Sequence, residues 1–473
     1  MAKDIIFKTF RTKLNGYVYD RHTHSVFALP DAEFEELQRV ERGELLPEDS
    51  IVIAMLQEQG VLQKNVVTEI KHPSTDYLSH YIAHRLGQLI LQVTQQCNLR
   101  CGYCCYGGGY THMRVHANQW MEWETAKRAI DFYLERTDER DTLTISFYGG
   151  EPLLAFPLIK QCVSYITEHV EGKEIHFSMT TNGTLLTPEV VDYLYEHHFH
   201  LSISLDGTKE DHDVNRKFRS GQGSFDTIMN HIREIKEAHP DFMKDIAIMT
   251  TINPKMDLGC AMDYFEANEY LADSRFVYNS VATKGAKETI NYDEPSKLLR
   301  RYEYLKLLLA HANMLDIECT SALMQSTRAH RMQVYQGLYQ HTPLPSVISH
   351  GGPCVPGNKR LFVSVDGAFF PCEKVSETSE YFCIGSLDEG IDEEKAARLL
   401  NCGQITADEC KECWNLRGCM MCMNQVDFEG MPCKADKCKV CADEKFRELS
   451  DLREICVLHE FGYDLPQEGD DRT

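Results

Sequence analysis

The sequence predicts an α/β protein whose centre is a partial, TIM-like (β/α)6 barrel, with a small domain before it and a cysteine-rich domain after it. Between residues 88 and 281, short β-type segments alternate with helix-type segments, the pattern of parallel strands joined by crossover helices. Glycines and short polar residues follow the first four strands, where barrel folds gather their reacting groups. Twelve of the 19 cysteines lie between residues 354 and 456, and a segment so poor in apolar helices is expected to fold around metal.

Length and charge set the broad class of the protein. The chain of 473 residues exceeds one hydrophobic core, and we divide it into residues 1–87, 88–315, 316–466 and a tail, 467–473. The net charge of −23 argues against partners such as nucleic acid or an anionic membrane surface. We identify no export signal and no membrane-length apolar run, so we expect a cytoplasmic protein. In that reducing compartment, abundant cysteines indicate metal ligands rather than disulfides.

The barrel elements can be assigned from their periodicity. The expected strands are residues 89–94, 143–148, 175–181, 201–205, 246–252 and 275–281. The expected helices between them are residues 123–137, 155–170, 187–198 and 223–239, and another follows at 294–315. The first four strands end in CNLRCGYC, GGEPLL, TTNGTLL and SLDG. Because the carboxyl ends of parallel strands meet at one edge, these four motifs are expected to surround one site.

The N-terminal segment predicts a small module of strands followed by helices. Residues 5–11, 16–20 and 25–30 alternate apolar with polar side chains, and residues 31–43 and 47–60 carry helix start and stop signals. This order resembles a winged-helix module, specifically the element with which enzymes that tailor ribosomal peptides hold a leader peptide. The alternative is a cap that only packs on the next domain.

Three cysteines in CNLRCGYC, at spacings of four and three, form the central motif. Cys97, Cys101 and Cys104 can hold three irons of a [4Fe–4S] cube and leave the fourth without a protein ligand. The motif resembles that of the radical S-adenosylmethionine (SAM) superfamily. The alternative is a zinc site completed by His112 or His116. Three isolated cysteines are expected to be buried apolar residues; they are Cys162, Cys260 and Cys319.

The same resemblance implies the cofactor-binding residues. Glycines and a carboxylate of GGEP would receive the amino group of SAM; they are Gly149, Gly150 and Glu151. Further contacts are implied for Thr180, Ser204, Arg216 as partner of the SAM carboxylate, and Tyr103 near the adenine. Cys105 has no assigned role. In this family, one electron from the cluster cleaves SAM to a 5′-deoxyadenosyl radical.

The C-terminal cysteines resemble the SPASM extension of radical SAM enzymes, which carries two auxiliary [4Fe–4S] clusters, so that three clusters are expected in all. Carried over by order, the first auxiliary cluster would be bound by Cys354, Cys372 and Cys422. The second would be bound by Cys410, Cys413, Cys419 and Cys441, with Cys433 and Cys438 as alternatives for the last ligand. The first cluster would have only these three ligands, and hence an open iron, unless Cys383 completes it. By spacing alone, the three CxxC pairs could also build two zinc ribbons.

The combination of domains resembles maturases of ribosomally made peptides, most closely those that form cysteine thioethers in sactipeptides and ranthipeptides. The resemblance implies a cysteine-rich precursor with a leader, and an electron donor such as flavodoxin or ferredoxin. It leaves open whether the acceptor carbon is α, β or γ. Glu373 falls where related enzymes carry an acidic base; the alternative is an exposed carboxylate on a turn. Other possibilities are carbon–carbon crosslinking, formylglycine formation, and, in another class, a zinc-binding winged-helix regulator.

Overall fold

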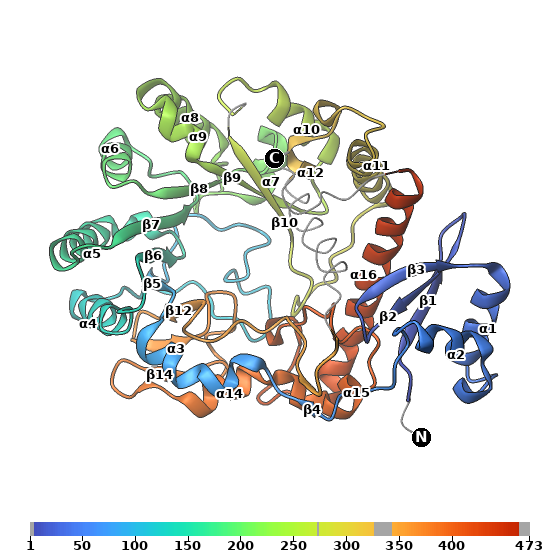
Figure 1. The fold of residues 1–473 in the computed structure, drawn as a ribbon. Helices are drawn as coiled ribbons and strands as arrows, with labels where there is room; N and C mark the ends of the chain where they lie inside the picture. The colour runs from blue at the N-terminus through green and yellow to red at the C-terminus, as the bar shows by residue number, and fades with distance from the viewer. Residues whose placement is uncertain (1–3, 272–273, 326–342, 463–473) are drawn as a thin grey trace.

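The computed structural model describes residues 4–271, 274–325 and 343–462 (Figure 1). The expected tail, 467–473, and part of the expected connector, 326–342, lie outside these ranges. Within them, no helix is both long enough and apolar enough to cross a membrane.

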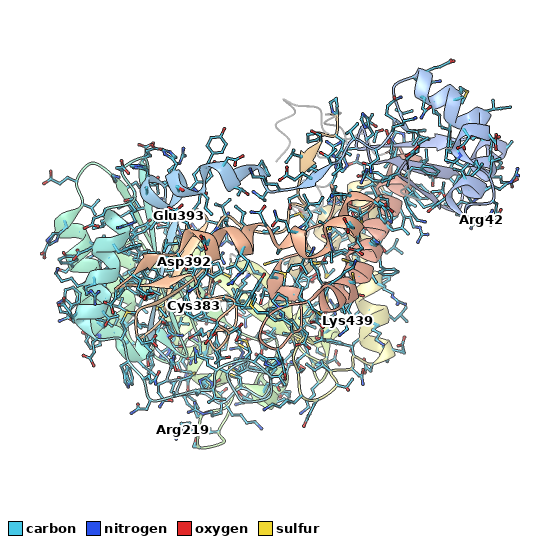
Figure 2. The ribbon with its side chains drawn as sticks, turned by 90° about the horizontal axis from the view of Figure 1, so that it is seen from below. Arg42, Arg219, Cys383, Asp392, Glu393 and Lys439 are labelled. Atoms are coloured by element: carbon cyan, nitrogen blue, oxygen red, sulfur yellow. The ribbon has the colours of Figure 1, made fainter. Side chains whose placement is uncertain are left out.

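The N-terminal module has the strands and helices that its sequence predicts. An antiparallel sheet of β1 (Phe7–Arg11), β2 (Gly16–Asp20) and β3 (Ser25–Leu29) is followed by α1 (Asp31–Glu41) and α2 (Ile51–Glu58). Ser50 ends the linker between the helices by accepting a hydrogen bond from the Ile53 amide at 3.1 Å, which caps α2. Seen from below, the part of the module that carries Arg42 stands out from the rest of the molecule (Figure 2).

All six predicted barrel strands are present and parallel. They follow one another across the sheet in sequence order: β5 (Gln88–Thr94), β6 (Thr142–Gly149), β7 (Glu174–Thr181), β8 (His200–Ser204), β9 (Ala247–Ile252) and β10 (Arg275–Ser280). Four helices lie on the outer side of this curved sheet (Figure 1): α4 (Trp123–Leu134), α5 (Phe156–His169), α6 (Pro188–Glu196) and α8 (Phe225–Ala238). Ile145 and Phe147 of β6 are buried, and Ser146 between them points to the opposite face of the sheet.

The sheet is larger than the sequence predicts, because strands from the C-terminal part extend it to ten. β12 (Arg360–Val363) pairs in parallel with β5, and β13 (Ala368–Phe370), β14 (Gly385–Ser386) and β15 (Gly390–Ile391) continue it antiparallel. A separate pair joins β4 (Glu69–Ile70) to β11 (Val347–Ile348). The barrel and the cysteine-rich segment therefore share one sheet.

The remaining helices are mostly short. The α-helices are α3 (Leu78–His84), α7 (Lys209–Asn215), α9 (Pro240–Asp245), α10 (Leu258–Ala267), α11 (Glu294–His311), α12 (Ala322–Gln325), α14 (Glu393–Leu400), α15 (Ala407–Lys411) and α16 (Lys434–Glu460). The 3-10 segments are η1 (Pro47–Asp49), η2 (Pro73–Tyr77), η3 (Pro152–Ala155), η4 (Ile317–Cys319), η5 (Cys402–Thr406) and η6 (Met423–Gln425). The 27-residue α16 was not expected, since its sequence is charged on most sides.

The prediction that three isolated cysteines are buried is correct only for Cys162, which has no exposed surface. Cys260 and Cys319 are exposed. Cys260 lies in the first turn of α10, where Asp257 caps its amide, and Cys319 ends a one-turn 3-10 helix. Both positions are at element ends on the surface, so the general tendency of free cysteine to be buried does not apply.

The two ends of the described chain pack together. Phe10, Tyr17 and Tyr19 of the module form a core with Leu452 and Ile455 of α16. In Figure 1, β1–β3 stand next to the C-terminal helix. At the end of α16, Oε1 of Glu460 accepts hydrogen bonds from three side chains of the module, those of Thr12, Asn15 and Tyr17. The module is thus joined to the cysteine-rich part by both apolar and polar contacts.

A buried arginine extends the contact between the module and the C-terminal part to a cysteine-containing loop. Arg21 follows β2 and is 1% exposed. Its Nη1 donates to the carbonyl oxygen of Lys411 at 2.7 Å and to that of Cys413 at 3.2 Å. Charged donors to carbonyls are among the stronger hydrogen bonds in proteins. The N-terminal module therefore holds the backbone of the Cys410–Cys413 loop.

We expect Leu452→Ala to loosen the module and α16 together, because the fully buried leucine belongs to their shared core. Removing it should cost about 3 kcal/mol, as is usual for Leu→Ala in a core. Native-state hydrogen exchange would measure this loss as faster amide exchange in both β2 and α16. Phe446→Ala on the same helix, at a side chain 71% exposed, is the control and should change little. Faster exchange in α16 alone would contradict the shared core.

Candidate active site

The three-cysteine loop follows β5, at the edge where barrel strands end. Cys97 is buried, and its thiol interacts electrostatically with those of Cys101 and Cys104. Burial raises the pKa of Cys97 to about 12 and that of Cys101 to about 11. Such thiols stay protonated unless a metal displaces their protons, so the loop suits metal-thiolate bonds better than free thiolates.

Two donors are directed at the sulfur of Cys97. The Leu99 amide lies 3.4 Å from Sγ, and Nδ2 of Asn182 lies 3.8 Å from it. Hydrogen bonds to cysteine sulfur stabilise the thiolate of an iron–sulfur ligand. The residues around this loop therefore fit a cluster.

Gly149 and Gly150 allow two backbone segments to touch. A Cβ on Gly149 would lie 2.1 Å from the Thr94 carbonyl oxygen, and one on Gly150 would lie 2.3 Å from that of Gln96. The Gly150 amide donates to Thr94 O at 3.1 Å, and the Glu151 amide donates to Gln96 O at 2.9 Å. The glycines thus fix the GGEP segment against the cysteine loop, and their contact with SAM stays a prediction.

Glu151 connects the GGEP and TTNG motifs. Its buried carboxylate accepts from Thr181 Oγ1 at 2.7 Å, from the Asn182 amide at 2.7 Å and from the Leu153 amide at 3.1 Å. Burial raises the pKa of Glu151 to about 7. Three donors already occupy this carboxylate, so any bond to a cofactor amine would be a fourth.

TTNG supplies two residues that the sequence analysis missed. Thr181 and Asn182 bind Glu151, and Asn182 Nδ2 also donates to Asn98 Oδ1 at 2.8 Å, inside the cysteine loop. The predicted residue, Thr180, is exposed on the other face of β7. Both missed residues belong to the TTNG motif, so the motif itself was the signal that could have identified them.

SLDG contributes a carboxylate that the prediction also missed. Asp206 is fully buried and accepts from Arg216 Nε at 2.8 Å, from the Tyr103 hydroxyl and from the Thr251 amide. Arg216 and Tyr103 were predicted to face SAM, and the structure joins both to Asp206 beside Cys101. Ser204, at the end of β8, is buried. This ion pair positions Arg216 whether or not a cofactor carboxylate also binds it.

Four predicted cysteines line a small cavity of about 30 Å³ in the C-terminal part. They are Cys410, Cys413, Cys419 and Cys441. Of the three candidates for the last position, Cys441 lines the cavity, whereas Cys433 is exposed and donates to Asp436 at 3.0 Å. The structure thus brings together the four thiols predicted for the second auxiliary cluster, and the donor set fits one.

The cysteines predicted for the first auxiliary cluster also lie near one another. Cys422 interacts electrostatically with both Cys354 and Cys372, and Cys354 is exposed. Cys383 donates to the Gly385 carbonyl at 3.5 Å. Cys402, which the sequence analysis left without a role, is buried and interacts with cysteines of both groups. Cys354 is thus the solvent-exposed member of the set predicted for the first auxiliary cluster.

No three His, Cys, Asp or Glu side chains of the described ranges converge on a position for one metal ion. Such a position would suit a mononuclear site, like the zinc sites of the alternative, whereas thiolates of an iron–sulfur cube bind separate irons. His116 does approach the cysteine loop, with Nε2 3.6 Å from Cys104 Sγ. His112 instead lies 3.6 Å from Glu429.

Glu373 is not the exposed turn carboxylate of the alternative reading. Its side chain is 15% exposed, and Oε1 accepts from Arg360 Nη1 at 2.9 Å. Oε2 is buried and has no hydrogen-bond partner among the described residues. The carboxylate interacts electrostatically with Tyr148, at the end of β6. Glu373 thus has one buried oxygen without a protein partner among the described residues.

A buried polar network that the sequence did not predict joins the cysteine loop to the C-terminal part. Arg114 Nε donates to Glu377 Oε1 at 2.8 Å, and Gln92 Nε2 donates to Glu377 Oε2 at 2.7 Å. The Arg114 guanidinium also lies 3.6 Å from the centre of the Tyr106 ring. These contacts hold the segment after Cys105 against the barrel.

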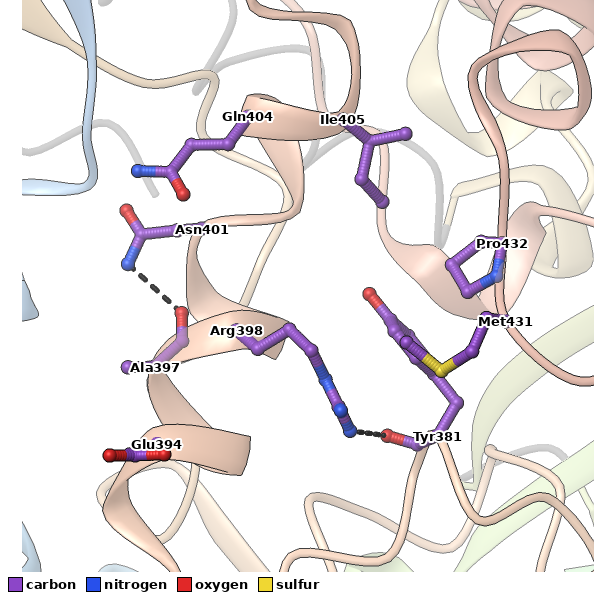
Figure 3. Close-up of a pocket in the computed structure, with 9 residues that line it drawn as sticks. All are labelled: Tyr381, Glu394, Ala397, Arg398, Asn401, Gln404, Ile405, Met431 and Pro432. Atoms are coloured by element: carbon purple, nitrogen blue, oxygen red, sulfur yellow. Dashed lines mark hydrogen bonds between the residues drawn. The ribbon is translucent and has the colours of Figure 1, made fainter.

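A larger cavity, of about 300 Å³, lies between α14, η5 and residues 431–432 (Figure 3). Arg398 Nη2 donates to the Tyr381 carbonyl at 2.9 Å, and the Tyr381 hydroxyl is buried without a partner among the described residues. The lining includes none of the predicted site residues, so this cavity has no assigned role.

We expect Gly150→Ala to displace the cysteine loop, because its Cβ would overlap the Gln96 carbonyl. If Cys97, Cys101 and Cys104 bind a cluster, the anaerobically reconstituted variant should lose about four irons per chain. Iron and sulfide analysis measures this loss. Gly109→Ala is the matched control, since a Cβ there meets no atom within 4 Å. Equal iron in both variants would mean that this contact does not support metal binding.

Comparison with known proteins identifies the central domain. Residues 91–257 match the Radical SAM superfamily. An uncharacterized protein of Methanocaldococcus jannaschii is 36% identical over 141 residues, which are 30% of this chain and 46% of that protein. The cysteine-type anaerobic sulfatase-maturating enzyme of Clostridium novyi is 27% identical over 36% of this chain and 44% of its own. The chain thus spans about half the length of these relatives.

A longer match extends beyond that domain. The cysteine-type anaerobic sulfatase-maturating enzyme of Clostridium perfringens is 24% identical over 72% of this chain and 90% of its own. The solved structure of anSMEcpe with bound AdoMet covers 79% of this chain and 99% of its own, with a TM-score of 0.57 and 21% identity, so the two share a fold. Residues 91–257 therefore form a radical SAM domain, which implies a [4Fe–4S] cluster, and the chain is homologous to anaerobic sulfatase-maturating enzymes.

Proposed function

We propose that this chain is a radical SAM peptide maturase that forms thioethers between cysteine sulfur and carbon in a ribosomally made, cysteine-rich precursor. The observation that carries the proposal is the arrangement of cysteines in three groups. One group follows β5 inside the radical SAM domain, and two lie in the C-terminal part that extends the same sheet. A catalytic cluster with two auxiliary clusters suits an oxidation that releases electrons.

The first group would generate the radical. Cys97, Cys101 and Cys104 would hold a [4Fe–4S] cluster, which together with SAM would supply a 5′-deoxyadenosyl radical. Glu151 keeps the GGEP segment and TTNG in register with this loop through its three hydrogen bonds. Asp206 holds Arg216, our candidate for the SAM carboxylate, in place.

The other two groups would serve the substrate. Each thioether removes two hydrogens from the precursor: a hydrogen atom from the acceptor carbon, and a proton with an electron from the thiol. Glu373 is our candidate for the proton, because its Oε2 is free of protein partners among the described residues. Cys354, Cys372 and Cys422 would hold an auxiliary cluster whose count of three thiolates leaves an iron for the substrate thiolate.

The N-terminal module is proposed to hold the leader peptide. In the described part of the chain, β3 pairs only with β2, so one edge of this sheet offers backbone donors and acceptors. An extended peptide can add to such an edge as a further strand. The contacts of Arg21 with the carbonyls of Lys411 and Cys413 support this proposal, since they join the module to a loop that carries two predicted ligands.

Formylglycine formation is the second candidate, and homology to sulfatase-maturating enzymes favours it. The module at residues 4–70, with its free edge strand, instead favours a substrate with a leader. Carbon–carbon crosslinking uses the same parts. All three reactions would take place in the cytoplasm, where a flavodoxin or ferredoxin is the proposed electron donor.

Mass spectrometry of a co-expressed precursor tests the reaction. If a short cysteine-rich peptide is encoded beside this gene, we expect it to lose two hydrogens per crosslink and one alkylatable thiol per crosslink. Carbon–carbon links would leave every thiol free to alkylate, and formylglycine would appear as an aldehyde. Either result would overturn the thioether proposal.

The control variants test the radical site in the same experiment. Replacing Cys97, Cys101 and Cys104 with alanine should abolish both 5′-deoxyadenosine and crosslinks and leave the auxiliary clusters bound. Cys260→Ala removes an exposed cysteine on α10 and should leave both products unchanged. Undiminished 5′-deoxyadenosine from the triple variant would end the proposal.

We expect the leader to protect the free edge of the module. Hydrogen exchange of the full chain, with and without the leader part of that precursor, should slow in β3, because added-strand hydrogen bonds cover its amides. β1 is the internal control, since the Thr9 amide of this strand already donates to Glu41 Oε2 at 3.0 Å. If the leader binds and β3 exchanges at the same rate as before, strand addition at β3 is wrong and the module is a structural cap.

A further inference from the structure

A lysine is buried in the cysteine cavity of the C-terminal part. Lys437 lies in the first turn of α16 and is 1% exposed. Its Nζ is 2.6 Å from Thr406 Oγ1 and 3.9 Å from Cys410 Sγ, and Thr406 Oγ1 is 3.3 Å from the same sulfur. Lysine is almost never fully buried unless it is paired, so its position needs a partner. Its partners in the structure are the Thr406 hydroxyl and the Cys410 thiol.

The other charged groups near the cavity leave this cation uncancelled. Glu444 also lines the cavity, but it accepts from Arg447 Nη2 at 2.8 Å and from the Met420 amide at 3.2 Å. His350 is buried beside Cys402, with 3.9 Å between Nε2 and Sγ. Lys445 lines the cavity as well and is only partly buried. Arg21 is also buried, but the atom that it binds at Cys413 is the backbone carbonyl oxygen. Lys437 is the buried charge whose contact is with a predicted ligand sulfur, that of Cys410.

A fixed positive charge in a buried site favours the addition of an electron nearby. Its field is weakly screened there, in contrast to the field of a surface lysine. Hydrogen bonds to the ligand sulfur act in the same direction, since they disperse the negative charge of the reduced cluster. At Lys437, both the positive charge and the hydrogen bond act on the sulfur of Cys410.

We propose that Lys437 raises the reduction potential of the cluster bound by Cys410, Cys413, Cys419 and Cys441, and so makes it the electron-accepting auxiliary cluster. This role rests on the proposed function, because it requires that the cavity hold a cluster. Lys437 is a positioning residue in this scheme: it touches a ligand sulfur and has no contact with the substrate.

The test is an EPR-monitored redox titration of the reconstituted full chain, with Cys97, Cys101 and Cys104 replaced by alanine to remove the catalytic signal. The signal lost in a further Cys410→Ala variant is assigned to this cluster. Lys437→Met keeps the length of the side chain and removes its charge. We expect the equilibrium constant for reduction to fall at least about tenfold, which is about 59 mV for one electron. Lys445→Met is the matched control and should change it less.

The outcomes separate this inference from the proposed function. Reconstituted protein without iron in the cavity would overturn both. A loaded cluster with the same potential in Lys437→Met as in the parent protein would overturn only the role of Lys437. If Lys437→Met fails to load, Lys437→Gln, which keeps a donor without charge, is titrated instead and should also show a lowered potential. Loss of the cluster from both neutral variants would make Lys437 an assembly residue and overturn the redox role.

Discussion

The candidate site depends on the close approach of two backbone segments at the end of the sheet. The amides of Gly150 and Glu151 donate to the carbonyl groups of Thr94 and Gln96, and only glycine at positions 149 and 150 lets the two segments come so near. Glu151 then binds the amide of Asn182, so a third segment is fixed to the first two. The backbone and side-chain contacts of these neighbouring segments thus hold the cysteine loop in place.

A second constraint is the shared sheet. Because β12 pairs directly with β5, the C-terminal cysteines are attached to the strand that precedes the cysteine loop. The buried pair of Arg114 and Glu377 adds a polar link across the same boundary. The three groups of cysteines thus belong to one continuous framework, which suits electron transfer over fixed distances.

The sequence predicted those parts whose signal is local. The six barrel strands have clear periodicity, and the motifs after them carry their own spacing, so both were found. The strands β12–β15 have two to four residues each and left no such pattern. α16 was missed because charged residues surround it. Arg114 and Glu377 are 263 residues apart, and the choice of Cys441 over Cys433 depends on helix geometry, so neither could be read from spacing.

The hydrogen bonds from Arg21 to the Cys410–Cys413 loop have a practical consequence for engineering. Under the proposed function, residues 4–70 look like a cassette that could be exchanged to change which peptide is accepted. Their inner surface, however, supplies the guanidinium that binds the Cys410–Cys413 loop and the tyrosines that cover α16. A chimaera would have to inherit that inner surface from this chain and take only the outer strand and its flanking loops from the donor.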